Sequence, residues 1–346
     1  DSIWESLRFA VVVRKRASID PADLPPHHEV FSSNEMSSLA GSGLAIREKV
    51  FRHESVAGLV TDEVAHYLER YGLYRGTLPT HSTAFRLETP RLFIVSDEKN
   101  DEARALTESL SKYEVSSEPN CLLVIGGDGT MLHAIRKYWR WRLPFLGINA
   151  GHRGFLLNGA DELVNGFPHT RLTIRQSPLL YVECLPIGSG ETRWKKALAF
   201  NDAWVERATG QAAWMEVKVN DQVRLPRLIA DGILLSTAAG STAYARAMGA
   251  TPLLVETQAL TLVGSNTMDP PNWTSALLSL DSQVEFSTLA PGKRPLVGFV
   301  DGVPQGGIER MRARVSRIAA VELAFCPGHD MAEKIAEIQF PSNLLH

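Results

Sequence analysis

The sequence has 346 residues, of which 44% are hydrophobic and 22% are charged, and its formal net charge is −3. This composition is typical of a globular protein, and the length exceeds the usual size of one hydrophobic core, so we expect two domains. No apolar run approaches the ~20 residues of a membrane-spanning helix, and the slight acidic excess does not favour nucleic-acid binding. Three widely separated cysteines, Cys121, Cys184 and Cys326, argue against a disulfide framework and a zinc site. They favour a reducing compartment, and we expect the cytoplasm.

The first half of the chain alternates apolar strands with amphipathic helices. Residues 9–13 (FAVVV) have the continuous β-branched pattern of a strand buried on both faces. The Pro-, Ser- and His-rich stretch over 20–43 predicts a loop, and the helical spacing over 56–71 predicts a helix, for which Thr61-Asp62-Glu63 would suit the start. Further strands are expected at 92–95, 121–125 and 145–148, with helices at 101–113 and 131–141. This alternation predicts a Rossmann-like parallel sheet with helices on its faces.

Beyond about residue 160 the sequence consists mostly of short strand-like runs. They fall at 180–185, 203–207, 215–219, 232–236, 260–263, 284–286, 296–300 and 319–325. Asn220-Asp221 lies between two of them and predicts a hairpin turn. We therefore expect an α/β domain over 1–155 and an antiparallel, β-sandwich-like domain over 156–325, with 326–346 packing back onto the first domain.

The most informative motif is Gly126-Gly127-Asp128-Gly129-Thr130, which follows the strand at 121–125 and precedes a helix. Glycine lets a backbone approach a ligand closely, and a helix N-terminus presents N–H groups that hold phosphate oxygens. An acid there would repel phosphate, so Asp128 is expected to take a proton, bind a hydroxyl or hold magnesium. The alternative is a structural strand-to-helix turn with Asp128 as its N-cap. No GxxxxGK[ST] and no helix-opening GxGxxG is present, which excludes a P-loop and gives no indication of a Rossmann NAD site.

Three further segments accompany this motif. The segment 147–156 (GINAGHRGFL) ends the next strand, where ligands of open α/β sheets bind, and an interdomain hinge is the alternative. The segment 231–244 joins a buried strand to a loop of small hydroxyl residues, whose N–H and O–H groups suit a nucleotide or cap a helix. Asn201-Asp202 precedes a strand and by itself indicates only a turn.

Taken in order, these segments and Asp301-Gly302 resemble the NAD kinase family over roughly residues 90–325. The resemblance implies phosphoryl transfer from ATP or polyphosphate, with Mg²⁺, to the 2′-hydroxyl of the adenosine ribose of NAD, giving NADP. It implies that Asp128 is the general base, and it names no metal ligand of the protein itself. It places at the bound nucleotides Gly126, Gly127, Gly129, Thr130, His133, Phe155, Asn201, Asp202, Asp231, Thr242, Ala243, Tyr244, Ala245, Arg246 and Ala247.

The sequence departs from the family pattern at Ala238-Ala239, where the family has Pro followed by Thr or Ser. The missing hydroxyl predicts that Ala239→Thr would tighten NAD binding. Two alternatives to an NAD kinase stay open at this point. One is a lipid, sphingoid or sugar kinase with the same GGDGT motif, and the other is a non-catalytic NAD(P)-binding regulator.

Basic and His-rich clusters have simpler explanations. Residues 136–142 (RKYWRWR) mix cations with aromatic rings, as nucleic-acid binders do, but they end a predicted helix, where cations complement the helix dipole. His27-His28 lacks a second metal-ligand pair, so we assign no transition metal. We expect a solvated strand face for Arg310, Arg312, Arg314 and Arg317. The alternative is that these arginines contact polyphosphate or another subunit. We expect nucleotides as small-molecule partners, a homo-oligomer (dimer or tetramer), and neither nucleic acid nor a membrane.

Overall fold

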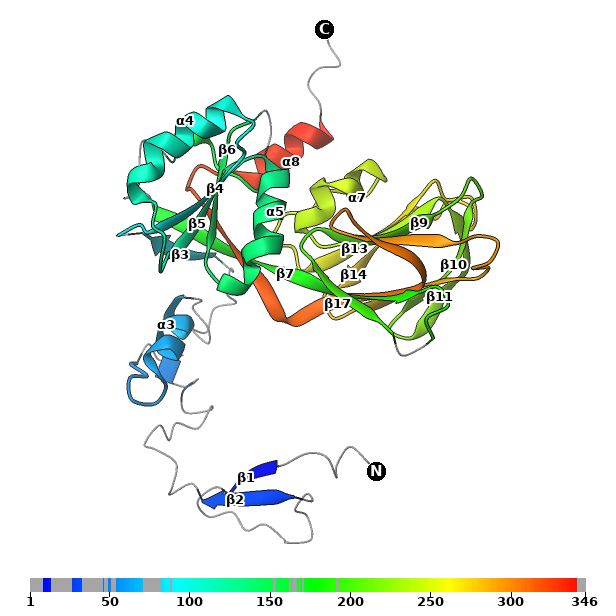
Figure 1. Ribbon diagram of the computed structural model, residues 1–346, viewed down its shortest axis with the longest axis horizontal. Coiled ribbons are helices and arrows are strands. Elements are labelled where there is room, and N and C mark those ends of the chain that lie inside the picture. The colour runs from blue at the N-terminus through cyan, green and yellow to red at the C-terminus, as the bar shows by residue number, and fades with distance from the viewer. Residues whose placement is uncertain are drawn as a thin grey trace. The chain divides into compact units, whose positions relative to one another are not determined.

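The computed structural model describes residues 9–13, 27–32, 46, 49–50, 54–70, 82–87, 89–151, 154–161, 163, 167, 169, 171–190 and 193–340. The chain divides into two compact units, Asp1–Thr80 and His81–His346 (Figure 1). The motifs identified above lie in the second unit. Within the described ranges, no helix is long and apolar enough to cross a membrane.

The first unit contains a parallel pair of strands and a helix. β1 (Phe9–Val13) pairs with β2 (His28–Ser32) in parallel. The loop predicted over 20–43 is therefore wrong at β2, where Val30 and Phe31 favour a strand and pairing with β1 outweighs their polar neighbours. The predicted burial of residues 9–13 on both faces lies outside what the structure describes. α3 (Asp62–Arg70) carries Asp62 and Glu63 in its first turn, which confirms the suggested start, whereas residues 56–61 of the predicted helix are not helical.

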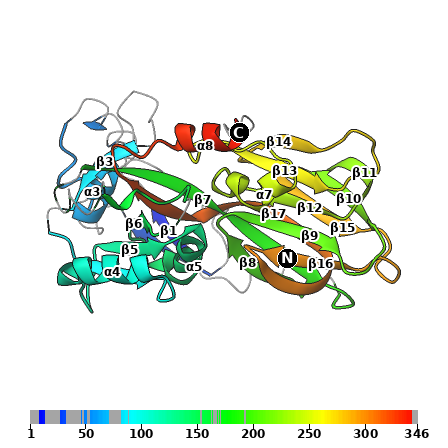
Figure 2. The ribbon, with the colours of Figure 1, turned by 90° about the horizontal axis from the view of Figure 1, so that it is seen from above.

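The second unit contains the predicted parallel sheet, which is confirmed. Its strands pair in the order β4 (Leu92–Ser96), β5 (Cys121–Gly126) and β6 (Phe145–Asn149). The connections are α4 (Asp101–Leu110) with η2 (Ser111–Tyr113), and α5 (Asp128–Tyr138) with η3 (Trp139–Trp141) (Figure 2).

Side chains alternate across β5 and are buried on both of its faces. Leu123 belongs to the buried cluster that contains Leu110 of α4, whereas Leu122 belongs to the cluster that contains Ile135 of α5. A strand covered on both faces needs apolar residues at every position, which is why 121–125 is a continuous apolar run. This packing fixes the carboxyl end of β5, where the GGDGT motif begins.

Helix α5 begins at Asp128, three residues before the predicted start at 131. Gly127 is its N-cap, with extended backbone angles of φ −109° and ψ −179°. The N-cap role considered for Asp128 therefore falls to Gly127, and Asp128 is the first helical residue. The apolar pattern misses this first turn because glycine and aspartate occupy it.

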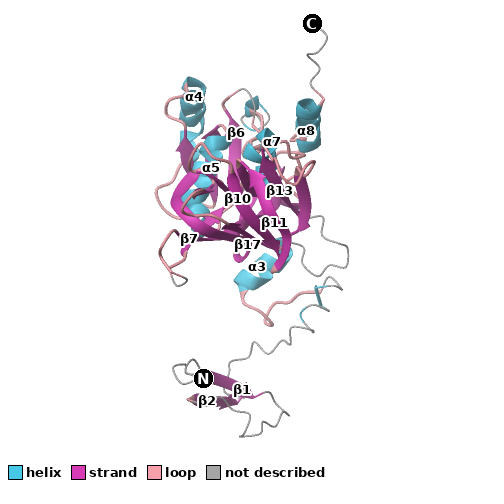
Figure 3. Ribbon diagram, turned by 90° about the vertical axis from the view of Figure 1, so that its right-hand side faces the viewer, coloured by secondary structure: helices cyan, strands magenta, loops and turns pink. Residues whose placement is uncertain are grey.

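The rest of the second unit is mainly antiparallel, as predicted. β7 (Arg171–Pro186) and β17 (Val303–Phe325) pair along most of their length, and β17 also pairs in parallel with β6, so the parallel and antiparallel parts share one sheet. Figure 3 shows that strands dominate this unit. The other strands are β3 (Ser82–Arg86), β8 (Lys195–Ala199), β9 (Asp202–Arg207), β10 (Ala213–Val219), β11 (Gln222–Ala230), β12 (Gly232–Ser236), β13 (Ala259–Ser265), β14 (Ser275–Ser279), β15 (Gln283–Thr288) and β16 (Leu296–Val300). The helical elements are η4 (Ala239–Thr242), α7 (Tyr244–Ala247) and α8 (Met331–Gln339).

The predicted strands of the second half are present, and two are parts of longer ones, 180–185 of β7 and 319–325 of β17. Asn220 and Asp221 have φ of 52° and 61°, the left-handed pair of a two-residue hairpin turn, which confirms that prediction. Strands β8, β11 and β14 were not predicted, because exposed polar residues interrupt their apolar pattern.

Candidate active site

The GGDGT turn contains one structural glycine and two with open surroundings. Gly126 has φ +156°, and an added Cβ there would lie 2.5 Å from the Thr130 hydroxyl oxygen, so packing requires glycine. An added Cβ at Gly127 or Gly129 would meet nothing within 4 Å. No side chain caps the helix at Gly127. The start of α5 therefore presents backbone N–H groups and a positive dipole end beside open space, which suits an anion.

Asp128 links this turn to the segment after β6. Its Oδ2 accepts the Phe155 N–H at 2.9 Å and its Oδ1 accepts the Leu156 N–H at 3.0 Å. Burial raises the pKa of this carboxyl, whereas the two hydrogen bonds and the charge of Lys334 act in the opposite direction. The structure thus brings together the first two predicted motifs, with His152 and Arg153 lying outside the described residues.

Two residues that the sequence analysis did not single out hold the same segment. Lys334 of α8 donates to the carbonyl oxygens of Gly154 at 2.8 Å and Leu157 at 2.9 Å. Asn158 is fully buried, and its amide donates to Gly147 and Ala324 carbonyl oxygens while its Oδ1 accepts the Cys326 N–H. These contacts join segments that are far apart in the sequence, so no local sequence motif predicts them.

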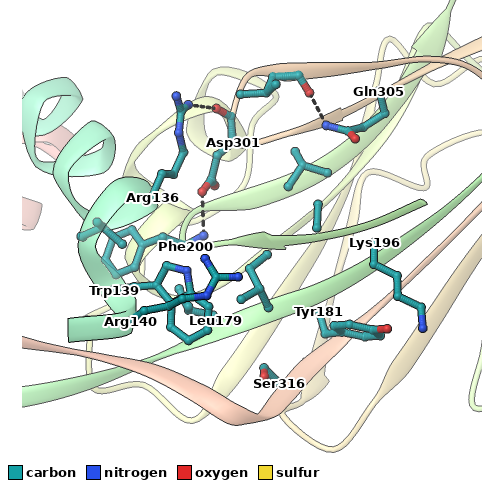
Figure 4. Close-up of a pocket in the computed structure, with 15 residues that line it drawn as sticks. Arg136, Trp139, Arg140, Leu179, Tyr181, Lys196, Phe200, Asp301, Gln305 and Ser316 are labelled. Atoms are coloured by element: carbon teal, nitrogen blue, oxygen red, sulfur yellow. Dashed lines mark hydrogen bonds between the residues drawn. The ribbon is translucent and has the colours of Figure 1, made fainter. Parts of the chain in front are cut away.

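The Asn201-Asp202 turn is organised by Asp301. The Asp301 carboxylate accepts the N–H groups of Phe200 at 2.7 Å, Asn201 at 2.8 Å and Asp202 at 3.1 Å. Asp301 itself has φ 47°, and its carbonyl oxygen accepts a hydrogen bond from Arg136 of α5 at 3.3 Å (Figure 4). Burial, followed by the negative charge of Asp301, raises the pKa of Asp202 to about 7. The late Asp-Gly pair and the Asn-Asp pair therefore form one structural unit.

Thr237 and Gly240 hold the loop after β12 against the same turn. The Thr237 hydroxyl donates to the Phe200 carbonyl oxygen at 2.7 Å, and the Gly240 N–H donates back to that hydroxyl at 3.2 Å. An added Cβ at Gly240 would lie 2.6 Å from two backbone carbons of Asn201, so this glycine is required by a close backbone approach. The third and fourth predicted motifs therefore also come together.

The remaining predicted residues of this region differ in exposure. Ala243, Tyr244, Arg246 and Ala247 are exposed, Thr242 is half-buried and Ala245 is buried. His133 is exposed on α5. Tyr244–Ala247 form the single turn α7, and Gly240-Ser241-Thr242 lies in the preceding η4.

Ala239 is 4% exposed and belongs to the same buried cluster as Leu156 and Phe200. A hydroxyl at this position would enter an apolar core instead of facing a ligand. This burial argues against the expectation that Ala239→Thr tightens NAD binding, because the added atoms would have to be accommodated by repacking.

Asp231 lies at the opposite end of β12 from Thr237. It forms an ion pair with Arg207 at 2.6 Å and accepts a hydrogen bond from the Asn266 amide at 2.7 Å. Asp231 and Tyr244 both line a cavity of about 320 Å³. The structure brings Asp231 near Tyr244, but gives it no contact with Asp128.

The protein thus has a GGDGT turn, in which backbone N–H groups hold the buried acid Asp128, at the end of a parallel strand. Its antiparallel part contributes the Asn201-Asp202 turn. This arrangement defines a kinase of the GGDGT type.

Residues 47–162 match the family model described as the ATP-NAD kinase N-terminal domain. The sequence is 32% identical over 247 residues to an NAD kinase of Rickettsia akari, covering 70% of this chain and 95% of that protein. It is 33% identical over 233 residues to an NAD kinase of Rickettsia africae, covering 67% and 89%. The chain belongs to the NAD kinase family, as the sequence motifs predicted.

Solved structures support the same fold. The yeast NADH kinase complexed with NADH superimposes with a TM-score of 0.57 at 16% identity, covering 98% of this chain and 89% of that one. An NAD kinase from Archaeoglobus fulgidus in complex with ATP gives a TM-score of 0.50 at 18% identity, covering 67% and 92%. The predicted α/β and antiparallel architecture is therefore confirmed.

Proposed function

We propose that this protein phosphorylates the 2′-hydroxyl of the adenosine ribose of NAD to give NADP, with ATP or polyphosphate as donor. The relatives named NAD kinase support the reaction class. The position of Asp128 supports its assignment as the catalytic residue. Two backbone N–H groups hold its carboxylate at the start of α5, where the surroundings of Gly127 and Gly129 are open.

Asp128 suits the role of general base. Each of its oxygens accepts one N–H group, and each keeps lone-pair capacity for a substrate hydroxyl. Burial moves its pKa up, toward the working pH of the enzyme, where a base accepts a proton more effectively. The two hydrogen bonds fix the direction of the carboxylate, so its position does not depend on the substrate.

The donor phosphates would lie at Gly127 and Gly129, where the backbone is open, with Gly126 and Thr130 shaping the turn. Among the described residues there is no cluster of three or more His, Cys, Asp or Glu side chains that could hold a metal ion. Magnesium in phosphoryl-transfer sites is commonly held by one or two carboxylates and the substrate phosphates, and Asp128, the carboxylate of this turn, fits that arrangement. When bound, Mg²⁺ would neutralise charge on the donor phosphates.

A nucleoside portion of NAD would lie against the Asn201-Asp202 turn. Asn201 supports this assignment because its Oδ1 is buried and has no hydrogen-bond partner, which leaves an acceptor for a ligand. Phe155 is half-buried and would form an apolar wall. The other residues proposed to line the nucleotide sites are His133, Asp231, Thr242, Ala243, Tyr244, Ala245, Arg246 and Ala247.

The test is NADP formation by the purified full chain, measured with an NADP-specific dehydrogenase. ATP with Mg²⁺, polyphosphate with Mg²⁺, and each donor with excess EDTA are compared. We expect NADP with at least one donor and none with EDTA, and we expect Asn201→Ala to raise KM for NAD. Phosphorylation of a sphingoid base, a diacylglycerol or a sugar without NADP formation would overturn the proposal, as would NAD binding without turnover.

We further propose that the enzyme acts in the cytoplasm as a homo-oligomer. Cys121, Cys184 and Cys326 are all buried, which is compatible with thiols kept in a reducing compartment. Burial raises the pKa of the Cys184 thiol to about 11, so it does not readily form the reactive thiolate. Light scattering after gel filtration tests the assembly. The domain boundaries 1–155 and 156–325 stay a prediction.

A further inference from the structure

A cavity of about 500 Å³ lies between the C-terminal half of α5 and the strands of the antiparallel part (Figure 4). Its apolar wall includes Ile135, Leu179, Leu198 and Val300. None of the residues assigned above to NAD, donor or base lines it. Asp128 is the first residue of α5, and Ile135 follows it by about two turns, or ~10 Å along the helix. This cavity is therefore distinct from the proposed catalytic site.

Cations dominate the polar part of this cavity. Arg136, Arg140 and Lys196 line it, and Asp301 is the only acid among its described lining residues. The carboxylate of Asp301 is engaged by three backbone N–H groups on the Asn201-Asp202 side. Within the described part of the chain, Lys196 and Arg140 form no ion pair. Asp301 therefore offsets the charge of Arg136, whereas the charges of Arg140 and Lys196 have no ion-pair partner among the described residues.

Aromatic rings accompany these cations. The Arg140 guanidinium lies 4.7 Å from the centre of the Trp139 ring, and Tyr181 lies on the β7 side with Lys196 nearby (Figure 4). An uncharged apolar ligand would desolvate the cations without compensation. A small inorganic anion would leave most of the apolar wall unused. A cavity of this size and composition suits a small organic ligand with few polar groups.

We propose that this cavity binds a small organic anion, in which an aromatic ring system contacts the apolar wall and a carboxylate, sulfonate or phosphate contacts Arg140 and Lys196. Charge-assisted hydrogen bonds to these two side chains would orient the ligand. The assignment adds a second ligand site to the proposed enzyme and does not depend on which substrate the first one takes.

The probe is 8-anilinonaphthalene-1-sulfonate, titrated by fluorescence into the full chain with and without saturating NAD. Its uncharged analogue N-phenyl-1-naphthylamine is titrated in parallel. The variants are Arg140→Ala and Lys196→Ala, and the control is Lys137→Ala, an exposed cation of α5 that does not line the cavity. We expect one sulfonate per chain, Kd raised about fivefold or more by each cavity variant, and Kd unchanged within about twofold by the control. The uncharged analogue should bind about tenfold more weakly.

The proposal is overturned if both cavity variants keep the wild-type Kd, if NAD displaces the probe competitively, or if the uncharged analogue binds as tightly as the sulfonate. Thermal melting checks that each variant folds. If a variant melts early, the comparison of the two probes on the wild-type protein decides.

Discussion

Asp128 and Lys334 bind the same four-residue segment, Asp128 through its two central N–H groups and Lys334 through the carbonyl oxygens at its two ends. Asp128 accepts the N–H groups of Phe155 and Leu156, and Lys334 donates to the carbonyl oxygens of Gly154 and Leu157. The positive charge of Lys334 also lowers the pKa of Asp128 against the effect of burial. The C-terminal helix α8 therefore contributes to the position and the protonation of the proposed base.

Replacing Lys334 by Met should disturb this base without touching the substrate. The loss of positive charge lets the pKa of Asp128 rise, so the acidic limb of the kcat–pH profile should move to higher pH. The segment Gly154–Leu157 also loses two hydrogen bonds, which should lower kcat. Lys99→Met, at an exposed position before α4, is the control. A kcat–pH profile identical to that of wild type would exclude this positioning role.

Asp202 should make the protein more stable in mild acid than at neutral pH. Its folded-state pKa of about 7 lies above that of an unfolded aspartate, near 3.9. The folded state therefore binds the extra proton over this window, and the stabilisation, present below pH 4, is lost as the pH rises through 7. Asp202→Asn removes this titration. We expect the free energy of unfolding of wild type minus variant to fall by about 1.4 kcal/mol per pH unit over pH 4–7. Urea unfolding at several pH values measures it, and a difference independent of pH would contradict it.

The sequence was informative where local chemistry decides the structure. The apolar run at 121–125 and the glycines after it located β5, the start of a helix and Asp128. The rule that ligands bind beyond the carboxyl ends of parallel strands placed the GGDGT turn and the segment after β6 at the same crevice, but it did not predict their hydrogen bonds.

Contacts between distant backbone groups could not be found this way. Lys334 binds carbonyl oxygens, which every residue has, so no residue type near Gly154 reveals it. The sequence showed Asp301 only as part of an Asp-Gly motif. Its hydrogen bonds to the backbone of residues 200–202 require the β16–β17 hairpin to lie beside β9. The burial of Ala239 was not predicted, because a family pattern specifies residue types but not which side chains are buried.

Gly240 should tolerate no side chain. Gly240→Ala places a methyl group 2.6 Å from backbone carbons of Asn201, which must move, and overpacking of this kind typically costs about 1–3 kcal/mol. Gly210→Ala is the matched control, since an added Cβ there meets nothing within 4 Å. Urea unfolding should show the loss only for Gly240→Ala. Equal stability of the two variants would mean that the Asn201 turn can shift freely.

Substitution of Gly129 should impair binding of the phosphoryl donor without lowering the stability of the protein. Gly129→Ala meets no atom within 4 Å and improves the helix propensity of α5, by up to about 1 kcal/mol. Its methyl group would occupy the space assigned to donor phosphates, so the KM for the donor should rise about tenfold or more while thermal stability is kept. An unchanged donor KM would place the phosphates elsewhere.

The most direct test of the account is Asp128→Asn, measured by single-turnover NADP formation and by the shift in melting temperature that NAD causes. Both oxygens of Asp128 accept N–H groups, so the amide of asparagine retains one of these bonds and cannot take a proton. The melting temperature without ligand is compared first, to account for the lost hydrogen bond. The rate of NADP formation should fall by about 10²–10⁴ while NAD still raises the melting temperature. A rate within a few-fold of wild type in the folded variant would contradict the assignment of Asp128 as the base.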